Sequence, residues 1–174
     1  HWFSPDPRFL LFPNDFKVSR SLRRSLSKET FELRIDSAFE EVIRSCSRAP
    51  RKDQPGTWIA PDMIEAYSTL HNEGFAHSFE SWRDGKLVGG LYGISLGSAF
   101  FGESMFHHES EASKVALAHL IEFAKQRNFD FIDCQIPTEH LASLGAMEVP
   151  RAKFLRLLKN ALEDTTIPAS WKPE

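Results

Sequence analysis

The chain has 174 residues, of which 41% are hydrophobic and 26% are charged, a composition typical of globular proteins rather than disordered ones. It has no apolar run near the roughly 20 residues of a membrane-spanning helix and no signal-peptide pattern, so membrane insertion and secretion are unsupported and we expect a cytoplasmic protein. The net charge of -3 argues against attraction of the whole protein to nucleic acid, but it allows a local basic patch.

The first third of the chain predicts alternating short strands and helices. Proline lacks the backbone N–H that a strand or helix needs, so Pro7 and Pro13 bound the first strand. The expected elements are, in order, an apolar strand ended by Pro13, a basic helix at 19–28, a strand at 31–36, a helix at 37–46 and a polar loop at 47–56. We divide the chain into a small N-terminal α/β part, residues 1–57, and a main domain, residues 58–174.

The basic helix carries a local excess of positive charge. Its cations are Arg20, Arg23, Arg24 and Lys28, and their spacing gathers them along one side of a short helix. A solvated surface face is the commoner explanation of such a charge run. Contact with RNA phosphates is the functional alternative, and it predicts salt-sensitive binding.

The main domain predicts a mixed α+β sheet with flanking helices. A helix begins near Pro61 and ends at Gly74, and Asp84-Gly85 is a strong hairpin signal. The expected elements are that helix, three antiparallel strands within 76–106, a helix at 109–127, a strand at 129–136, a helical turn at 138–144, a helix at 150–162 and an irregular tail. The strand that follows the long helix is expected to lie parallel to its neighbour.

Three polar side chains in the expected strands could carry chemistry. Strand periodicity places Asp133 and Gln135 on one side of their strand, where they form a candidate catalytic pair, although an aspartate that caps the next segment is an equally good explanation. Glu103 lies between apolar flanks, where burial would raise its pKa. It could bind a cationic or amine-bearing substrate, or it could face solvent on a one-sided sheet.

Metal and nucleotide cofactors have little support. The adjacent His107 and His108 would point to opposite faces of an extended segment, so a metal site is not expected. Cys46 and Cys134 are the only cysteines and lack the spacing of a zinc site or a disulfide scaffold. The chain also contains no P-loop or GxGxxG motif.

Several long motifs resemble the bacterial leucyl/phenylalanyl-tRNA-protein transferases. They run in order from Trp2 to about Leu158 and are "WFSPDPR", "GTWI", "EAY..LH..G.AHS.E.W", "LVGGLYG", "FGESMF", "ASK.AL" and "IDCQ....H..SLGA.E.PR". The resemblance implies an acetyltransferase-like (GNAT) fold for the main domain. It also implies transfer of Leu, Phe or Met from aminoacyl-tRNA to proteins with an N-terminal Lys or Arg, which marks them for degradation by the N-end rule.

The resemblance assigns roles to individual residues. Asp133 and Gln135 match the proposed catalytic pair, and Glu103 matches an acid beside the amino-acid pocket. The implied apolar pocket consists of Phe100, Met105, Leu117, Leu120 and Ile132, with the aromatic residues Trp58 and Tyr67 lining the site. Arg20, Arg23 and Arg24 match a basic cluster that contacts tRNA, and Lys28 continues it.

Two alternatives to the transferase remain open at this stage. The first is an acyltransferase that uses acetyl-CoA, but "FHHESEASK" replaces the glycine-containing loop that holds coenzyme A, so no cofactor is expected. The second is a non-catalytic homologue that binds tRNA or basic N-termini. Family members carry a further N-terminal segment with a "GIFPW"-like run before the motif that begins here at Trp2, so we expect that segment to be incomplete.

Overall fold

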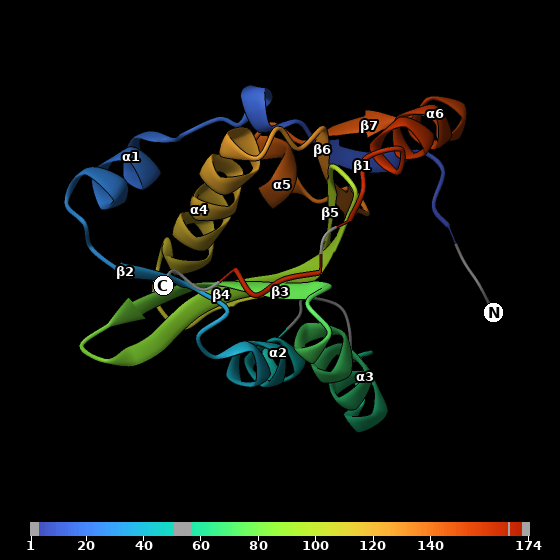
Figure 1. The fold of residues 1–174 in the computed structure, drawn as a ribbon. Helices are drawn as coiled ribbons and strands as arrows, with labels where there is room; N and C mark the ends of the chain where they lie inside the picture. The colour runs from blue at the N-terminus through green and yellow to red at the C-terminus, as the bar shows by residue number, and fades with distance from the viewer. Residues whose placement is uncertain (1–3, 51–56, 167, 172–174) are drawn as a thin grey trace.

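The computed structural model describes residues 4–50, 57–166 and 168–171, and these residues build one mixed sheet (Figure 1). The predicted α+β architecture is confirmed. The strand order is β2-β3-β4-β5-β6-β1-β7. The strands are β1 (Arg8–Leu11), β2 (Glu32–Ile35), β3 (Ala76–Arg83), β4 (Lys86–Leu96), β5 (Ala99–His107), β6 (Phe131–Gln135) and β7 (Met147–Val149).

Helices cover both faces of this sheet (Figure 1). The helices are η1 (Pro13–Asp15), α1 (Arg20–Ser27), α2 (Phe39–Arg48), α3 (Pro61–Asn72), α4 (Ala112–Gln126), α5 (Glu139–Ser143) and α6 (Arg151–Ala161). Helices α1 and α4 lie on one face, and α2 and α3 lie on the other. A buried hydrophobic core fills the space on each face, as expected for a sheet that has helices on both sides.

The central hairpins form as the sequence predicts. Asp84 and Gly85 both have positive φ angles, 50° and 72°, which is the geometry of a two-residue hairpin turn. Strands β3, β4 and β5 pair antiparallel. Strand β6 pairs parallel with β5, as predicted, because α4 carries the chain across the sheet between them.

The N-terminal strands belong to the same sheet as the rest of the chain. Strand β1 lies between β6 and β7, and β2 pairs with β3 at the opposite edge. The three-residue β7 was not predicted, since it is too short to show a periodic pattern. The division of the chain at residue 57 stays a prediction, and within the predicted loop residues 51–56 lie outside the described part.

Helix α4 begins three residues later than the sequence predicts. Its predicted start, Glu109, instead forms an ion pair with Arg83 at the end of β3. Glu111 has a φ of 69°, so a left-handed residue separates Glu109 from the first helical turn.

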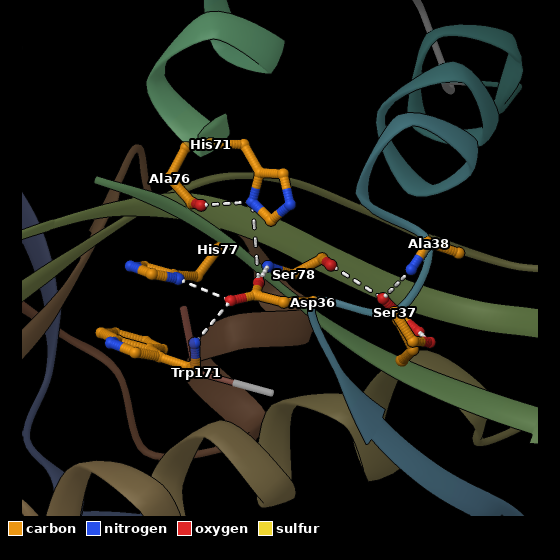
Figure 2. Close-up of polar contacts among 9 residues, drawn as sticks. Asp36, Ser37, Ala38, His71, Ala76, His77, Ser78 and Trp171 are labelled. Atoms are coloured by element: carbon orange, nitrogen blue, oxygen red, sulfur yellow. Dashed lines mark hydrogen bonds and ion pairs between the residues drawn. The ribbon is translucent and has the colours of Figure 1, made fainter. Parts of the chain in front are cut away.

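The C-terminal segment is irregular, as predicted, but it is held firmly in place. The backbone N–H of Trp171 donates to Asp36 Oδ2 at 3.2 Å (Figure 2). The buried Asp36 also accepts hydrogen bonds from His77 Nδ1 at 2.8 Å and from the Ser78 N–H at 2.9 Å. The indole of Trp171 stacks on the His77 ring with centroids 3.5 Å apart, so the tail is joined to both β2 and β3.

Candidate active site

An apolar pocket opens where β5 and β6 stop pairing. The parallel pairing ends at Phe101 and Asp133, and beyond this point side chains from both strands, α4 and α5 enclose a pocket of about 120 Å³. Its lining residues are Leu91, Tyr92, Gly102, Glu103, Ser104, Met105, Leu117, Leu120, Ile132, Cys134 and Leu141. An apolar cavity of about 150 Å³ in another protein holds benzene, so this pocket has the scale of one apolar amino-acid side chain.

Glu103 occupies a β-bulge at the mouth of this pocket. Tyr92 pairs with Ser104 and Gly93 pairs with Gly102, so Glu103 is the extra residue on β5. Bulges are common beside active sites because they redirect a side chain. Here the bulge turns a carboxylate of an otherwise sheet-forming segment toward the pocket.

Burial governs the ionisation of this carboxylate. Loss of solvation raises the pKa of Glu103, while hydrogen bonds from Tyr67 and Gln135 partly counteract the rise. Burial, followed by the charge of Glu103, also raises the pKa of the Tyr67 phenol, which therefore stays protonated and can donate to the carboxylate. Glu103 thus accepts hydrogen bonds from two donors, Tyr67 and Gln135.

Gln135 is placed beside Glu103 by a second irregularity. On β6, Phe9 pairs with Gln135 and Leu10 pairs with Asp133, so Cys134 is an extra residue, and Gln135 has a φ of 65°. The Gln135 N–H donates to Asp133 Oδ1 at 2.9 Å, and its Nε2 donates to the carbonyl of Gly102 at 3.2 Å. These bonds fix the end of β6 against the bulge of β5.

Asp133 is fully buried in an ion pair with Arg8. Arg8 Nε lies 2.9 and 3.0 Å from the two carboxylate oxygens, and its Nη2 lies 2.7 Å from Oδ2. The side chain of Asp133 has no exposed surface and that of Arg8 is 14% exposed. Both carboxylate oxygens therefore already accept hydrogen bonds, which fits a residue that positions others.

A second hollow, which we call the groove, adjoins the pocket. It has a volume of about 340 Å³, and its lining residues are Pro5, Arg8, Ile94, Leu96, Phe101, Glu103, Gln135 and Ile136. Glu103 lines both the groove and the pocket. The two hollows therefore meet at one carboxylate.

The structure gathers most of the predicted site residues and leaves some apart. Met105, Leu117, Leu120 and Ile132 line the pocket. Phe100 does not line it; its side chain is fully buried in the core, with its ring centroid 6.1 Å from that of Phe79.

The predicted aromatic residues of the site differ in their placement. Tyr67 is buried on α3 and bonds to Glu103, whereas Trp58 is 42% exposed and lines neither the pocket nor the groove as described. The basic residues Arg20, Arg23, Arg24 and Lys28 are exposed on α1 and its C-terminal cap. Helix α1 packs against α4, and its cations line neither hollow.

Several residues of the site were not singled out from the sequence. Leu91, Tyr92 and Leu141 complete the pocket wall, but their pattern is that of ordinary core residues. Arg8 had a signal, since it is the one charged residue of the strand "RFLL". Its partner, however, lies 125 residues further along the chain.

Burial disfavours ionisation of the thiol in the pocket. Burial, with a smaller contribution from the neighbouring Asp133 charge, raises the pKa of Cys134 to about 12. A thiol with this pKa stays protonated at neutral pH, whereas the thiolate is the reactive form. A covalent acyl intermediate on Cys134 is therefore disfavoured.

No metal-binding cluster of His, Cys, Asp or Glu side chains is found among the residues that the structure describes. Over the same residues, the longest helices fall short of the length and apolar character that a membrane crossing requires.

The fold and the site together define a class of protein. The chain is similar to the GCN5-related glucosamine N-acetyltransferase region of a fungal multi-domain GH3 β-N-acetylglucosaminidase, with a TM-score of 0.56 and 12% identity over 83% of this chain and 20% of that one. At this identity the likeness shows the fold alone. The predicted acetyltransferase-like fold is thereby confirmed, with an apolar pocket and a carboxylate at its sheet opening.

Sequence comparison specifies the family. The family model described as "Leucyl/phenylalanyl-tRNA protein transferase" matches residues 10–159. Proteins with that name from Nitrosospira multiformis and a Polaromonas species are 58% and 53% identical to this chain, over 91% and 99% of its length and 68% and 69% of theirs. The chain belongs to this transferase family, and the resemblance seen in its motifs is confirmed.

Proposed function

We propose that this protein transfers Leu, Phe or Met from an aminoacyl-tRNA to the α-amino group of proteins that begin with Lys or Arg. The transfer would mark those proteins for degradation and would take place in the cytoplasm, where aminoacyl-tRNA is made and used. Family membership supports the aminoacyl-tRNA donor and the protein acceptor. The junction of pocket and groove at Glu103 is the observation that carries the proposal.

The pocket suits the side chain of the transferred amino acid. Its volume of about 120 Å³ and its walls of Met105, Leu117, Leu120 and Ile132 favour an apolar side chain. A pocket of this kind discriminates by only about 1–3 kcal/mol per methylene. Such weak discrimination is consistent with acceptance of three apolar amino acids.

The groove suits a cationic acceptor. Arg8 and Asp133 neutralise each other, so Glu103 is the carboxylate left to determine the local charge of the groove. A half-buried carboxylate that has no ion-pair partner stabilises a nearby cation. This arrangement supports an acceptor whose first residue is Lys or Arg.

Positioning accounts for most of the proposed chemistry. The neutral α-amine attacks the ester carbonyl, a C–N bond forms, the C–O bond to the terminal ribose breaks, and the proton lost from the amine ends on the ribose oxygen. An α-amino group has a pKa of about 7.7–8.0, so it is partly neutral near pH 7. Holding amine and ester in contact provides effective molarities of about 10⁵–10⁸ M, and no covalent enzyme intermediate is needed.

Gln135 is proposed to orient the attacking amine. Its amide donates to the carbonyl of Gly102 and to the carboxylate of Glu103, which leaves its carbonyl oxygen to accept a hydrogen bond from the amine. Asp133 holds Gln135 through its backbone N–H. In this scheme Gln135 and Glu103 contact substrate, and Asp133 and Arg8 position them.

Coenzyme A is disfavoured as the acyl carrier. In acetyltransferases of this fold the pyrophosphate is held at the start of the helix that follows the central strands, where helix N-termini favour anions. Here the segment "FHHESEASK" before and at the start of α4 contains no glycine that would let the backbone approach a pyrophosphate closely, and its Lys114 is already paired with Glu111. An acyl donor that carries its phosphates elsewhere, as tRNA does, needs no pyrophosphate site at this helix.

The test is transfer of radiolabelled Leu and Phe from charged tRNA to peptides that begin with Lys, Arg, Asp or Glu. We expect label on the Lys and Arg peptides only. Thermal-shift measurements with coenzyme A run beside it, and we expect no stabilisation. Binding of tRNA without transfer would instead identify a non-catalytic binding protein, and stabilisation by coenzyme A would identify an acetyltransferase.

A further inference from the structure

Helix α6 presents a row of three exposed cations. Lys153, Arg156 and Lys159 follow one another at intervals of three residues, which correspond to about 4.5 Å along a helix axis. Together with Leu157 and Asn160 they line a shallow surface hollow. The three positive charges therefore lie along one side of the helix rather than around it.

These three cations do not stabilise the fold through ion pairs. In the described ranges none of them forms an ion pair, whereas the exposed cations Arg44 and Lys125 pair with Glu40 and Glu122 on their own helices. Helix α6 contains no acidic residue.

Helix stabilisation explains at most one of the three cations, because only Lys159 lies in the last turn of α6, where a cation favours the helix dipole. Lys153 lies in the first turn of α6, as does Arg151. Cations there oppose the helix dipole instead of stabilising the helix.

The row begins beside the candidate active site. The N–H of Arg151 at the start of α6 donates to Asp6 Oδ1 at 3.1 Å, and the guanidinium of Arg8 lies 5.1 Å from the centroid of the Phe154 ring. Arg8 lines the groove. Figure 1 shows α6 next to β7 and β1, while α1 lies at the opposite end of the molecule beyond α4.

We propose that Lys153, Arg156 and Lys159 form a second contact surface for the phosphates of the donor tRNA, separate from the basic helix α1. This inference rests on the proposed function, because it takes aminoacyl-tRNA as the donor. A regular row of cations without acceptor groups matches the continuous negative charge of a nucleic-acid backbone. The location beside the groove lets an RNA whose 3′ end reaches Glu103 pass over α6.

The test replaces the three cations by neutral residues of similar length. The variant is Lys153→Gln/Arg156→Gln/Lys159→Gln, and its affinity for uncharged tRNA is measured across a range of salt concentrations. We expect the slope of log affinity against log salt to fall by about 2–3, since each lost phosphate contact removes about 0.7–0.9. The affinity at low salt should fall at least about tenfold.

A matched control separates this contact from an effect of net charge. Arg44→Gln/Arg48→Gln/Lys125→Gln removes three exposed cations from α2 and α4, and we expect it to keep the wild-type slope. Equal slopes for the two triple variants, or an α6 variant that matches the wild type, would overturn the inference. An α6 variant that loses binding to phosphatidylglycerol vesicles but not to tRNA would also overturn it, in favour of a membrane surface.

A second donor distinguishes failure of this inference from failure of the proposed function. Leucine esterified to a lone adenosine carries no phosphates to reach α6, so the α6 variant should use it as well as the wild type does while using charged tRNA poorly. A wild type that binds tRNA through α6 but transfers from neither donor would contradict the proposed function alone. A wild type that does not bind tRNA would overturn both proposals.

Discussion

The sequence predicts the raised pKa of Glu103, but it does not predict where the side chain lies. A carboxylate between apolar flanks predicts burial and a raised pKa; in the structure Glu103 is half-buried, and loss of solvation raises its pKa. The bulge that places Glu103 between pocket and groove depends on its pairing with β4. That pairing is decided by the register of two strands and leaves no local sequence signal.

The raised pKa of Glu103 predicts a pH-dependent stability. A carboxyl group whose pKa is higher in the folded protein binds its proton more tightly there, so its contribution is largest below the unfolded pKa, about 4.3, and is lost as pH rises through the folded value. The Glu103→Gln variant has no proton to lose at this position, so its stability does not fall in this way as pH rises. We therefore expect the Tm of Glu103→Gln, relative to wild type, to increase with pH across that window and then level off.

Tyr67→Phe provides the companion measurement. The phenol lowers the pKa of Glu103 by donating a hydrogen bond, so its removal should raise that pKa further and move the window to higher pH. Thermal melts of Tyr67→Phe and Tyr67→Phe/Glu103→Gln over the same pH range measure the shift. A window that stays fixed or moves downward would contradict the assigned hydrogen bond.

The buried ion pair of Arg8 and Asp133 predicts strong coupling between two residues far apart in sequence. Removing one partner of a buried pair leaves the other charge unpaired and costs about 3–5 kcal/mol. We expect Arg8→Ala and Asp133→Ala each to destabilise by about this amount, and the double variant to cost less than the sum. Urea unfolding of all four proteins gives the coupling energy.

The same variants test the positioning role of Asp133. Because Asp133 holds the backbone of Gln135, Asp133→Ala should lower Leu transfer to an Arg-starting peptide far more than it lowers tRNA affinity. Both quantities are measured below the melting temperature of the variant. Additive destabilisation would contradict the ion pair, and unchanged transfer would remove Asp133 from the mechanism.

At the scale of elements, the basic helix α1 is shaped by one buried residue and several exposed cations. Leu22 is fully buried and anchors the helix, while Ser19 caps it by accepting the N–H of Leu22 at 3.2 Å. Arg20, Arg23 and Arg24 need not contact anything within the fold to keep this helix in place. They are therefore free to serve a partner.

Removal of two of these cations gives a direct test of α1. We expect Arg23→Ala/Arg24→Ala to weaken tRNA binding and to reduce its salt slope by about 1–2, with little change in thermal stability because both side chains are exposed. Filter binding across salt concentrations measures the slope. A slope equal to that of the wild type would make α1 an ordinary solvated surface.

Local sequence patterns predicted which helices and strands form better than they predicted which strands pair in the sheet. Asp84-Gly85 determines a hairpin through its own backbone angles, and the apolar positions of α4 are set by helical periodicity. In contrast, β1 pairs with strands more than 120 residues away. Burial of Asp133 follows from that pairing, so neither its partner Arg8 nor the positioning role proposed for it was accessible from the strand alone.

At the scale of the whole molecule, Trp171 in the C-terminal segment holds several elements together. Trp171 packs on His77 and lies with its ring centroid 4.4 Å from that of Phe123 on α4. Its backbone is bonded to Asp36, at the end of β2 (Figure 2). An apparently irregular tail thus connects an edge strand, the central sheet and the main helix.

Truncation of this side chain should affect stability without affecting chemistry. We expect Trp171→Ala to lower the free energy of unfolding by about 3 kcal/mol, while transfer per folded molecule stays unchanged because Trp171 lines neither the pocket nor the groove. Leu155→Ala, at a side chain that is 53% exposed, is the control and should change stability by less than about 0.5 kcal/mol. Equal melting curves for the two variants would show that Trp171 does not stabilise the fold.

The meeting of pocket and groove at Glu103 also has a consequence for turnover. After transfer, the new N-terminal Leu or Phe keeps the same apolar side chain and the same α-ammonium group that it had on the donor. In the proposed function, the pocket therefore binds this side chain in the product through the contacts that bind it in the donor. Product that begins with Leu or Phe should therefore compete with the donor, and transfer should slow as tagged product accumulates.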